Sequence, residues 1–138
     1  MPRVMVVDDD GQVREVWRAI LEEAGYDVVE AEDGVRAMDV QRRTPADLVI
    51  TDLLMPVKDG LETIMHLQRT SPSVKVIAVT GGGKILRPDL LRQAKLLGAV
   101  RNFQKPLDAE KLLDAVRELA GPPDAKAAGS SSVTPSQA

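Results

Sequence analysis

The stretch Val4-Met5-Val6-Val7-Asp8-Asp9-Asp10 places a short apolar run directly before a row of carboxylates. Short Val- and Ile-rich runs that alternate with helical stretches are typical of parallel strands buried on both faces. In open sheets built from such strands, ligands bind at the carboxyl ends of the strands. The stretch therefore predicts a buried strand that delivers acidic side chains to a binding edge.

The same arrangement recurs at three later points in the chain. Asp52 follows the apolar run 48–51, Thr80 follows the run 74–79, and Lys105 ends the last apolar run. Because parallel strands bring their carboxyl ends to one edge of the sheet, these side chains are expected beside the first aspartates. The sequence thus predicts three carboxylates, one hydroxyl and one ammonium at a single edge.

Strand-like and helical segments alternate regularly between these points. Strands are predicted over 3–7, 27–31, 47–51, 74–79 and 100–104. Helices are predicted over 12–24, over 34–43, through 61–67 up to the Ser71-Pro72 break, over 88–97 and over 108–120. Five such units favour an α/β fold whose parallel sheet has right-handed crossovers and helices on both faces.

The first and last helices each carry an apolar stripe at helical spacing. The stripe consists of Val13, Val16, Trp17, Ile20 and Leu21 in the first helix, and of Leu112, Leu113, Val116 and Leu119 in the last. Asp10 and Asp108 are placed to cap the amino ends of these helices, and Gly25 to end the first with a left-handed residue. Each helix is therefore expected to bury one face.

The composition indicates a single domain without membrane or redox chemistry. The chain has 138 residues, of which 43% are hydrophobic, and it contains no cysteine, which excludes disulfides and thiolate metal sites. A net charge of −3 with interspersed signs argues against nucleic acid as a direct partner. No apolar segment is long enough for a membrane helix or a signal peptide, so a soluble, cytoplasmic protein is expected.

The last residues of the chain differ from the rest. Gly121-Pro122-Pro123 is followed by Ala, Gly, Ser, Thr and Pro with almost no large apolar side chain. Such a segment cannot bury enough surface to offset the entropy lost on ordering. We therefore predict one domain over 1–120 and a flexible, low-complexity tail over 121–138.

The predicted carboxylate cluster is suited to a hard cation. Three carboxylates in one crevice repel one another, and Mg²⁺ relieves this because it prefers oxygen ligands and retains waters or phosphate oxygens. Helix capping accounts for Asp10 but not for Asp52. A carboxylate beside Mg²⁺ can attack phosphorus as a nucleophile, and Lys105 and Thr80 have the chemistry to stabilise the transferring phosphoryl group.

Four groups of residues together resemble the receiver domain of two-component response regulators. They are Val6-Val7-Asp8-Asp9-Asp10, Asp52-Leu53-Leu54-Met55-Pro56 with Asp59-Gly60, Thr80-Gly81, and Lys105-Pro106. The resemblance covers about residues 3–120 in the expected order and is to the stand-alone, chemotaxis-regulator-like members. It implies a flavodoxin-like fold with the strand order 2-1-3-4-5.

The resemblance also implies a role for each residue of the predicted site. Asp52 resembles the phosphoacceptor, and Asp9 resembles a direct Mg²⁺ ligand beside it. Asp8 resembles an acidic neighbour that holds the metal through water, and Leu54 resembles the residue that supplies a backbone carbonyl ligand. Thr80 resembles the hydroxyl that moves toward the phosphoryl group, and Lys105 resembles the ammonium that pairs with that group. The metal set is therefore Asp8, Asp9, Asp52 and the carbonyl of Leu54.

The implied function is that of a single-domain response regulator. Asp52 would accept a phosphoryl group from a sensor histidine kinase or a histidine phosphotransfer protein, and phosphorylation would switch binding to a downstream effector protein. Such a protein is not an enzyme in the ordinary sense, because it catalyses only its own phosphorylation and dephosphorylation. Neither nucleic acid nor a membrane is an expected direct partner.

Three features depart from the family pattern, one of which is Lys58 at a turn position that is commonly apolar. Members often carry Tyr or Phe three residues before the lysine, where the ring turns inward, but this chain has Asn102 there. Phe103 lies one place later, and since neighbouring strand residues point to opposite faces, it is expected in the core. The segment 81–85 is also richer in glycine than the usual loop.

A haloacid-dehalogenase-like phosphatase is the alternative. Asp8-Asp9-Asp10-Gly11 fits the start of that motif, with Asp8 as the nucleophile and Asp10 as the proton donor. Gln12 stands where that family usually has Thr, however, and the alternative leaves Asp52 without a role. A degenerate receiver that serves only as a scaffold is disfavoured because all five pocket residues are present.

Overall fold

The computed structural model describes residues 2–53, 60–80, 88–105 and 107–123. Its strands are β1 (Arg3–Val7), β2 (Asp27–Ala31), β3 (Leu48–Asp52), β4 (Lys75–Thr80) and β5 (Arg101–Gln104). Its helices are α1 (Gly11–Glu23), α2 (Gly34–Arg43), α3 (Gly60–Thr70), α4 (Pro88–Leu97) and α5 (Ala109–Ala120). Strands and helices alternate along the chain, as the sequence predicted.

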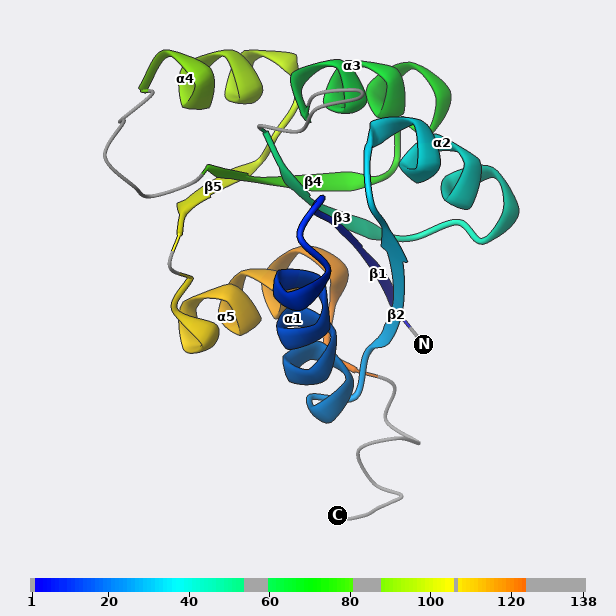
Figure 1. The fold of residues 1–138 in the computed structure, drawn as a ribbon, viewed down its shortest axis with the longest axis vertical. Coiled ribbons are helices and arrows are strands. Elements are labelled where there is room, and N and C mark those ends of the chain that lie inside the picture. The colour runs from blue at the N-terminus through cyan, green and yellow to red at the C-terminus, as the bar shows by residue number, and fades with distance from the viewer. Residues whose placement is uncertain (1, 54–59, 81–87, 106, 124–138) are drawn as a thin grey trace.

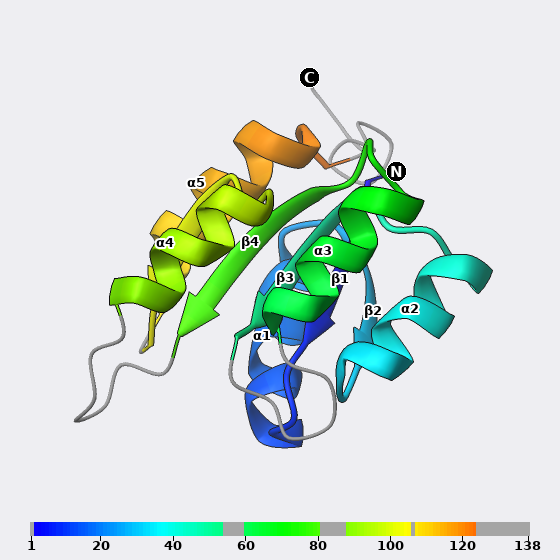
Figure 2. The ribbon, with the colours of Figure 1, turned by 90° about the horizontal axis from the view of Figure 1, so that it is seen from above.

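The five strands pair in parallel in the order β2-β1-β3-β4-β5. This result confirms the predicted fold class and strand order. Helices α1 and α5 cover one face of the sheet, and α2, α3 and α4 cover the other (Figure 1). Figure 2 shows the latter three helices side by side. Because the chain leaves β1 for β2 and returns to β3 on the other side of β1, the topological switch lies between β1 and β3.

Alternate residues of each strand supply two separate cores. In β1, Val4 and Val6 pack with residues of α1 and α5, whereas Met5 and Val7 pack with residues of α2 and α3. None of these four side chains has exposed surface. Burial on both faces explains why the strands are continuous apolar runs and not alternating patterns.

The predicted helix-capping residues are confirmed. Asp10 accepts hydrogen bonds from two backbone N–H groups in the first turn of α1, and Asp108 does the same for α5. These side chains satisfy donors that have no partner within the helix. Gly25 follows α1 with a φ of 100°, in the region that favours glycine.

Strands β3 and β4 both lie one residue later than predicted. The N–H of Val74 donates to the carbonyl oxygen of Ser71, so Val74 belongs to the preceding turn and not to β4. At the other end, Asp52 pairs with Val79 as the last residue of β3. Asp52 is therefore held by the sheet itself and does not follow it in a loop.

The exposed position of Val16 corrects the predicted apolar face of α1. Val16 is 56% exposed, whereas Trp17 and Leu21 of the same stripe are buried. The five apolar positions span a wider arc of the helix than the sheet and α5 cover. One edge of the stripe is consequently left at the surface.

The end of α5 is tied to the turn between α1 and β2. The hydroxyl of Tyr26 donates a hydrogen bond to the carbonyl oxygen of Gly121 at 2.8 Å. Residues 124–138, which form most of the predicted tail, lie outside the described residues. Within the described part, no helix is both long enough and apolar enough to cross a membrane.

Candidate functional site

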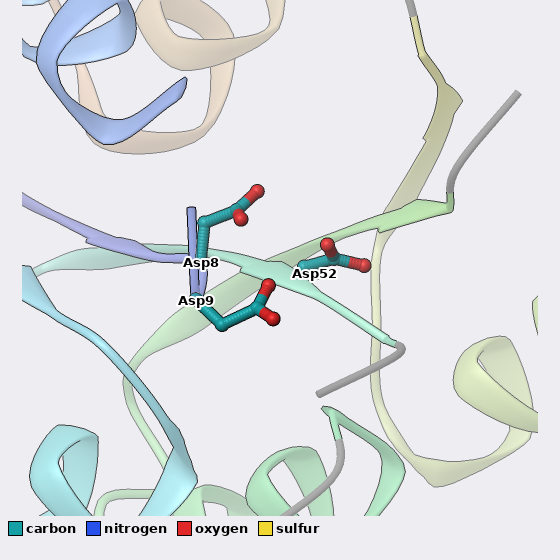
Figure 3. Close-up of side chains that lie close together, drawn as sticks. All are labelled: Asp8, Asp9 and Asp52. Carbon is teal, nitrogen blue, oxygen red and sulfur yellow. The ribbon is translucent and has the colours of Figure 1, made fainter. Parts of the chain in front are cut away.

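The three predicted aspartates meet at the switch point between β1 and β3. Asp8 and Asp9 directly follow β1, and Asp52 ends β3, which is paired with β1 so that Val7 lies opposite Thr51. One carboxylate oxygen from each aspartate lies within 4.8 Å of the others. Figure 3 shows the three side chains grouped at this edge of the sheet. The strand pairing thus creates the cluster that the sequence predicted.

The three carboxylates differ in their access to solvent. Asp8 has no exposed surface and Asp52 is 5% exposed, whereas Asp9 is exposed. The Oδ1 atom of Asp8 accepts a hydrogen bond from the N–H of Asp10 at 2.9 Å. A buried carboxylate is costly unless hydrogen bonds and positive charge compensate for its lost hydration.

Lys105 supplies that positive charge. Its Nζ atom lies 2.8 Å from Oδ2 of Asp8 and 3.0 Å from Oδ2 of Asp52. Its backbone N–H donates to the carbonyl oxygen of Thr80 at 2.8 Å, which fixes the lysine to the end of β4. The ammonium therefore bridges the two buried carboxylates from a position set by the sheet.

Two opposing effects act on the ionisation of Lys105. Burial alone lowers the pKa of its ammonium, but the hydrogen bonds to Asp8 and Asp52 and the charges of these carboxylates outweigh it. The pKa of Lys105 consequently lies above its ordinary value. The lysine is thus positively charged at neutral pH.

Thr80 completes the described part of the predicted site. It is the last residue of β4 and its side chain is buried, with 4% of the residue exposed. Because β4 is the neighbour of β3, Thr80 lies at the same edge as Asp52. Leu54 and the glycine-rich segment 81–85 lie outside the described residues, so the carbonyl ligand and this loop stay predictions.

The donor atoms at this edge fit a hard divalent cation. Carboxylate oxygens are the protein ligands that Mg²⁺ prefers, and Mg²⁺ needs few of them because it retains several waters. Both oxygens of Asp8 already accept hydrogen bonds, from Asp10 and from Lys105. Asp52 likewise accepts a hydrogen bond from Lys105, so the ammonium contacts both buried carboxylates of the cluster.

Three contacts of the site were not predicted from the sequence. Arg14 of α1 donates from Nη1 to the backbone carbonyl of Asp8 at 2.6 Å. Nζ of Lys105 lies 5.8 Å from the centroid of the Trp17 ring. The N–H of Gly60 donates to the carbonyl of Leu53, directly after Asp52. Helical periodicity placed Arg14 and Trp17 on α1 but carried no signal for these long-range contacts.

The departures at β5 are as predicted. Asn102 is exposed, whereas Phe103 is partly buried against the core beneath α1 and α5. Since the two residues are neighbours in a strand, their side chains point to opposite faces of the sheet. Phe103 therefore does not replace an aromatic residue at position 102.

A family comparison agrees with this geometry. The sequence matches the response regulator receiver domain over residues 4–117. The chain belongs to this family. The match spans the aspartates, Thr80 and Lys105, and it leaves the haloacid-dehalogenase-like alternative without support. Receiver domains are part of the response regulators of two-component systems.

Individual relatives cover nearly the whole receiver domain. This chain is similar to sporulation initiation phosphotransferase F of Bacillus subtilis (strain 168). The two are 29% identical over 116 residues, which cover 84% of this chain and 91% of the relative. Protein CcdB of the same bacterium is 38% identical over 122 residues, covering 88% of this chain and 99% of that protein. Among solved structures, a response regulator receiver domain protein (CheY-like) from Methanospirillum hungatei JF-1 matches with a TM-score of 0.80 and 25% identity, covering 86% of this chain and 92% of that one.

Proposed function

We propose that this receiver domain accepts a phosphoryl group on Asp52 in the presence of Mg²⁺. The observation that carries the proposal is the bridge from Nζ of Lys105 to the buried carboxylates of Asp8 and Asp52. An ammonium at this place is positioned to neutralise negative charge that arrives at Asp52. Family membership supports the same role.

In the proposed reaction, a carboxylate oxygen of Asp52 attacks the phosphorus atom of the donor. The new O–P bond forms as the bond between phosphorus and the donor's nitrogen breaks, and the leaving imidazole takes the electron pair of that bond and a proton from solvent. Lys105 and Thr80 then contact oxygens of the transferring phosphoryl group through charge and a hydroxyl donor. Bound Mg²⁺ would neutralise part of the charge on these oxygens and on the carboxylates.

The metal ligands in this proposal are those that the family resemblance implies, and the grouping of the three aspartates supports them. Asp9 and Asp52 would contact Mg²⁺ directly, and Asp8, which has no exposed surface, would act through water. The backbone carbonyl of Leu54 is the further ligand that the resemblance implies. The oxygen set suits Mg²⁺, which retains the remaining positions for water and phosphate.

The donor in the proposal is a sensor histidine kinase or a histidine phosphotransfer protein, and the output is binding to a downstream effector protein. The domain would span 1–120, with 121–138 as its tail, and would act in the cytoplasm. Its catalysis would be limited to its own phosphorylation and dephosphorylation.

The structure offers a surface on which the donor protein could dock. A groove of about 650 Å³ runs between α1 and the start of α5. Its apolar lining includes Val13, Val16, Trp17, Ile20, Leu107 and Leu112. Lys105 also lines this groove and at the same time contacts Asp52. Because the groove and the site share this lysine, we propose the phosphohistidine donor as the occupant of the groove.

Labelling with acetyl phosphate tests the proposed reaction. Wild-type protein should gain one phosphoryl group by mass spectrometry when Mg²⁺ is present, and Asp52→Asn should gain none because the nucleophile is removed at constant shape. Asp114→Asn, at an exposed carboxylate on α5, should label like wild type. Labelling of Asp52→Asn at Asp8 would contradict the proposal and favour the phosphatase alternative.

A further inference from the structure

Trp17 is the single tryptophan of the chain, and its ring lies next to the lysine of the site. It belongs to α1, is 5% exposed and packs in the core with Ile50 and Leu112. Nζ of Lys105 lies 5.8 Å from the centroid of its ring. An ammonium within about 6 Å of an indole ring is attracted by the negative face of that ring.

The surroundings of Lys105 give this contact a specific consequence. The ammonium donates to Asp8 and Asp52, and the lysine side chain keeps 25% of its surface exposed. The ring of Trp17 therefore lies beside the ammonium of Lys105, in addition to the two carboxylates. An aliphatic residue at this position would fill the same core without attracting the ammonium.

We infer that Trp17 is a positioning residue whose ring holds the ammonium of Lys105 beside Asp52. The inference rests on the proposed function, in which Lys105 contacts the phosphoryl group on Asp52. The attraction restricts the flexible lysine side chain, so fewer of its conformers must be lost when the phosphoryl group arrives. Trp17 and Lys105 both line the groove between α1 and α5, so the ring borders both that groove and the lysine of the carboxylate cluster.

A series of fluorinated tryptophans separates this attraction from simple packing. Fluorine withdraws electron density from the indole face and weakens its pull on a cation while the ring stays nearly the same size. Because the chain has one tryptophan, biosynthetic replacement changes position 17 alone. Each analogue is placed in wild-type protein and in Lys105→Met, which removes the charge but retains most of the side-chain length.

Two measurements are compared across the series. The melting temperature of wild-type protein should fall stepwise with fluorination, and that fall should be absent in Lys105→Met, where the ring has no cation to attract. The rate of Asp52 labelling by acetyl phosphate in wild type should drop by about two- to fivefold over the series, which is the range expected for an exposed to partly buried cation–ring contact.

Equal melting shifts in both backgrounds would overturn the inference, because the ring would then act through packing alone. An unchanged melting temperature throughout would overturn it as well. The melting comparison does not depend on phosphorylation, so it tests the contact even if acetyl phosphate fails to label wild type. Failure of wild-type labelling would instead count against the proposed function.

Discussion

Nζ of Lys105 lies 2.8 Å from Oδ2 of Asp8, a carboxylate with no exposed surface, across 97 positions of sequence. Replacing Lys105 with Met should leave the buried negative charge of the site less compensated. We expect a loss of about 1.5–3 kcal/mol in the free energy of unfolding without metal, the range for hydrogen bonds to charged groups. Millimolar Mg²⁺ should restore part of this lost free energy of unfolding, because a divalent cation also neutralises the carboxylates. Urea unfolding with and without Mg²⁺ measures both values.

Lys111→Met is the matched control for this experiment. Lys111 is exposed on α5, so its replacement should change the free energy of unfolding little, with or without Mg²⁺. If Lys105→Met were as stable as wild type without metal, the bridge would not contribute to the native state.

Binding of Mg²⁺ should stabilise the wild-type protein. A ligand that binds only the native state stabilises it by RT ln(1 + [L]/Kd), so the melting temperature rises with the concentration of the ligand. Asp9→Ala removes an exposed carboxylate of the cluster, so the fold should remain while the metal-induced rise is largely lost. Differential scanning calorimetry over a Mg²⁺ series measures the shift. An equal rise in wild type and in Asp9→Ala would contradict the proposed ligand set.

Gly60→Ala should disturb the phosphoacceptor through the backbone. A Cβ at this position would lie 2.5 Å from Cα of Leu53 and would also collide with the carbonyl oxygen of Asp52. Backbone atoms of a central strand cannot yield as a flexible side chain does, so we expect a loss of about 1–3 kcal/mol. Asp52 labelling should slow as well. Chemical denaturation and acetyl phosphate labelling give the two values.

Gly11→Ala controls for the general effect of adding a methyl group. A Cβ there would meet only Nη2 of Arg14, at 3.5 Å, which is ordinary contact. Its stability should be unchanged or slightly higher, because alanine favours the helix more than glycine does. Equal losses in Gly11→Ala and Gly60→Ala would refute the steric argument.

The positions of the aspartates could be predicted from the sequence because they depend on strand composition and on a general property of parallel sheets. Asp8 and Asp52 follow from apolar runs alone, and pairing of β1 with β3 then brings them together. The assignment of Asp52 to the strand itself could not be predicted, since it depends on the pairing of Asp52 with Val79 of β4. A local sequence pattern does not show which residue of a distant strand will pair with a given position.

The contacts of α1 show a second limit of the sequence. Helical periodicity placed Val16 on the buried face, but the width of the covering sheet and of α5 decides which edge of the stripe stays exposed. In the same way, the pattern assigned Trp17 to the core without its lysine neighbour. The sequence also carried no signal for the contact of Arg14, which donates to the carbonyl of Asp8. These relations arise from tertiary packing between distant segments.

Glu30 should make stability depend on acid pH. The hydrogen bond from Arg18 chiefly lowers the pKa of its carboxyl, burial opposes this, and a hydrogen bond from Arg14 lowers it further. A lowered folded pKa means that the stabilisation is present above the unfolded pKa of about 4.3 and is lost as pH falls through the folded value. Glu30→Gln should therefore be less stable by about 0.5–1 kcal/mol at neutral pH.

That difference should shrink as the pH falls below about 4, because Glu30 in wild type then becomes neutral like Gln. Urea unfolding at a series of pH values measures it. Glu15→Gln, at an exposed position on α1, should show no such pH-dependent difference. If the difference in free energy of unfolding between wild type and Glu30→Gln persisted unchanged at low pH, the ion pairs of Glu30 would not be its cause.

Val16→Asp should slow phosphorylation by a protein donor without slowing it by acetyl phosphate. Val16 is 56% exposed in the groove that Lys105 also lines, so a charge there opposes an apolar partner but leaves Asp52 accessible. One new charge in such an interface should cost tenfold or more in transfer rate, or about 1.4 kcal/mol. Val35→Asp on α2, equally exposed at 57%, is the control and should transfer normally. Equal slowing of both variants, or slowing with acetyl phosphate, would place the donor elsewhere.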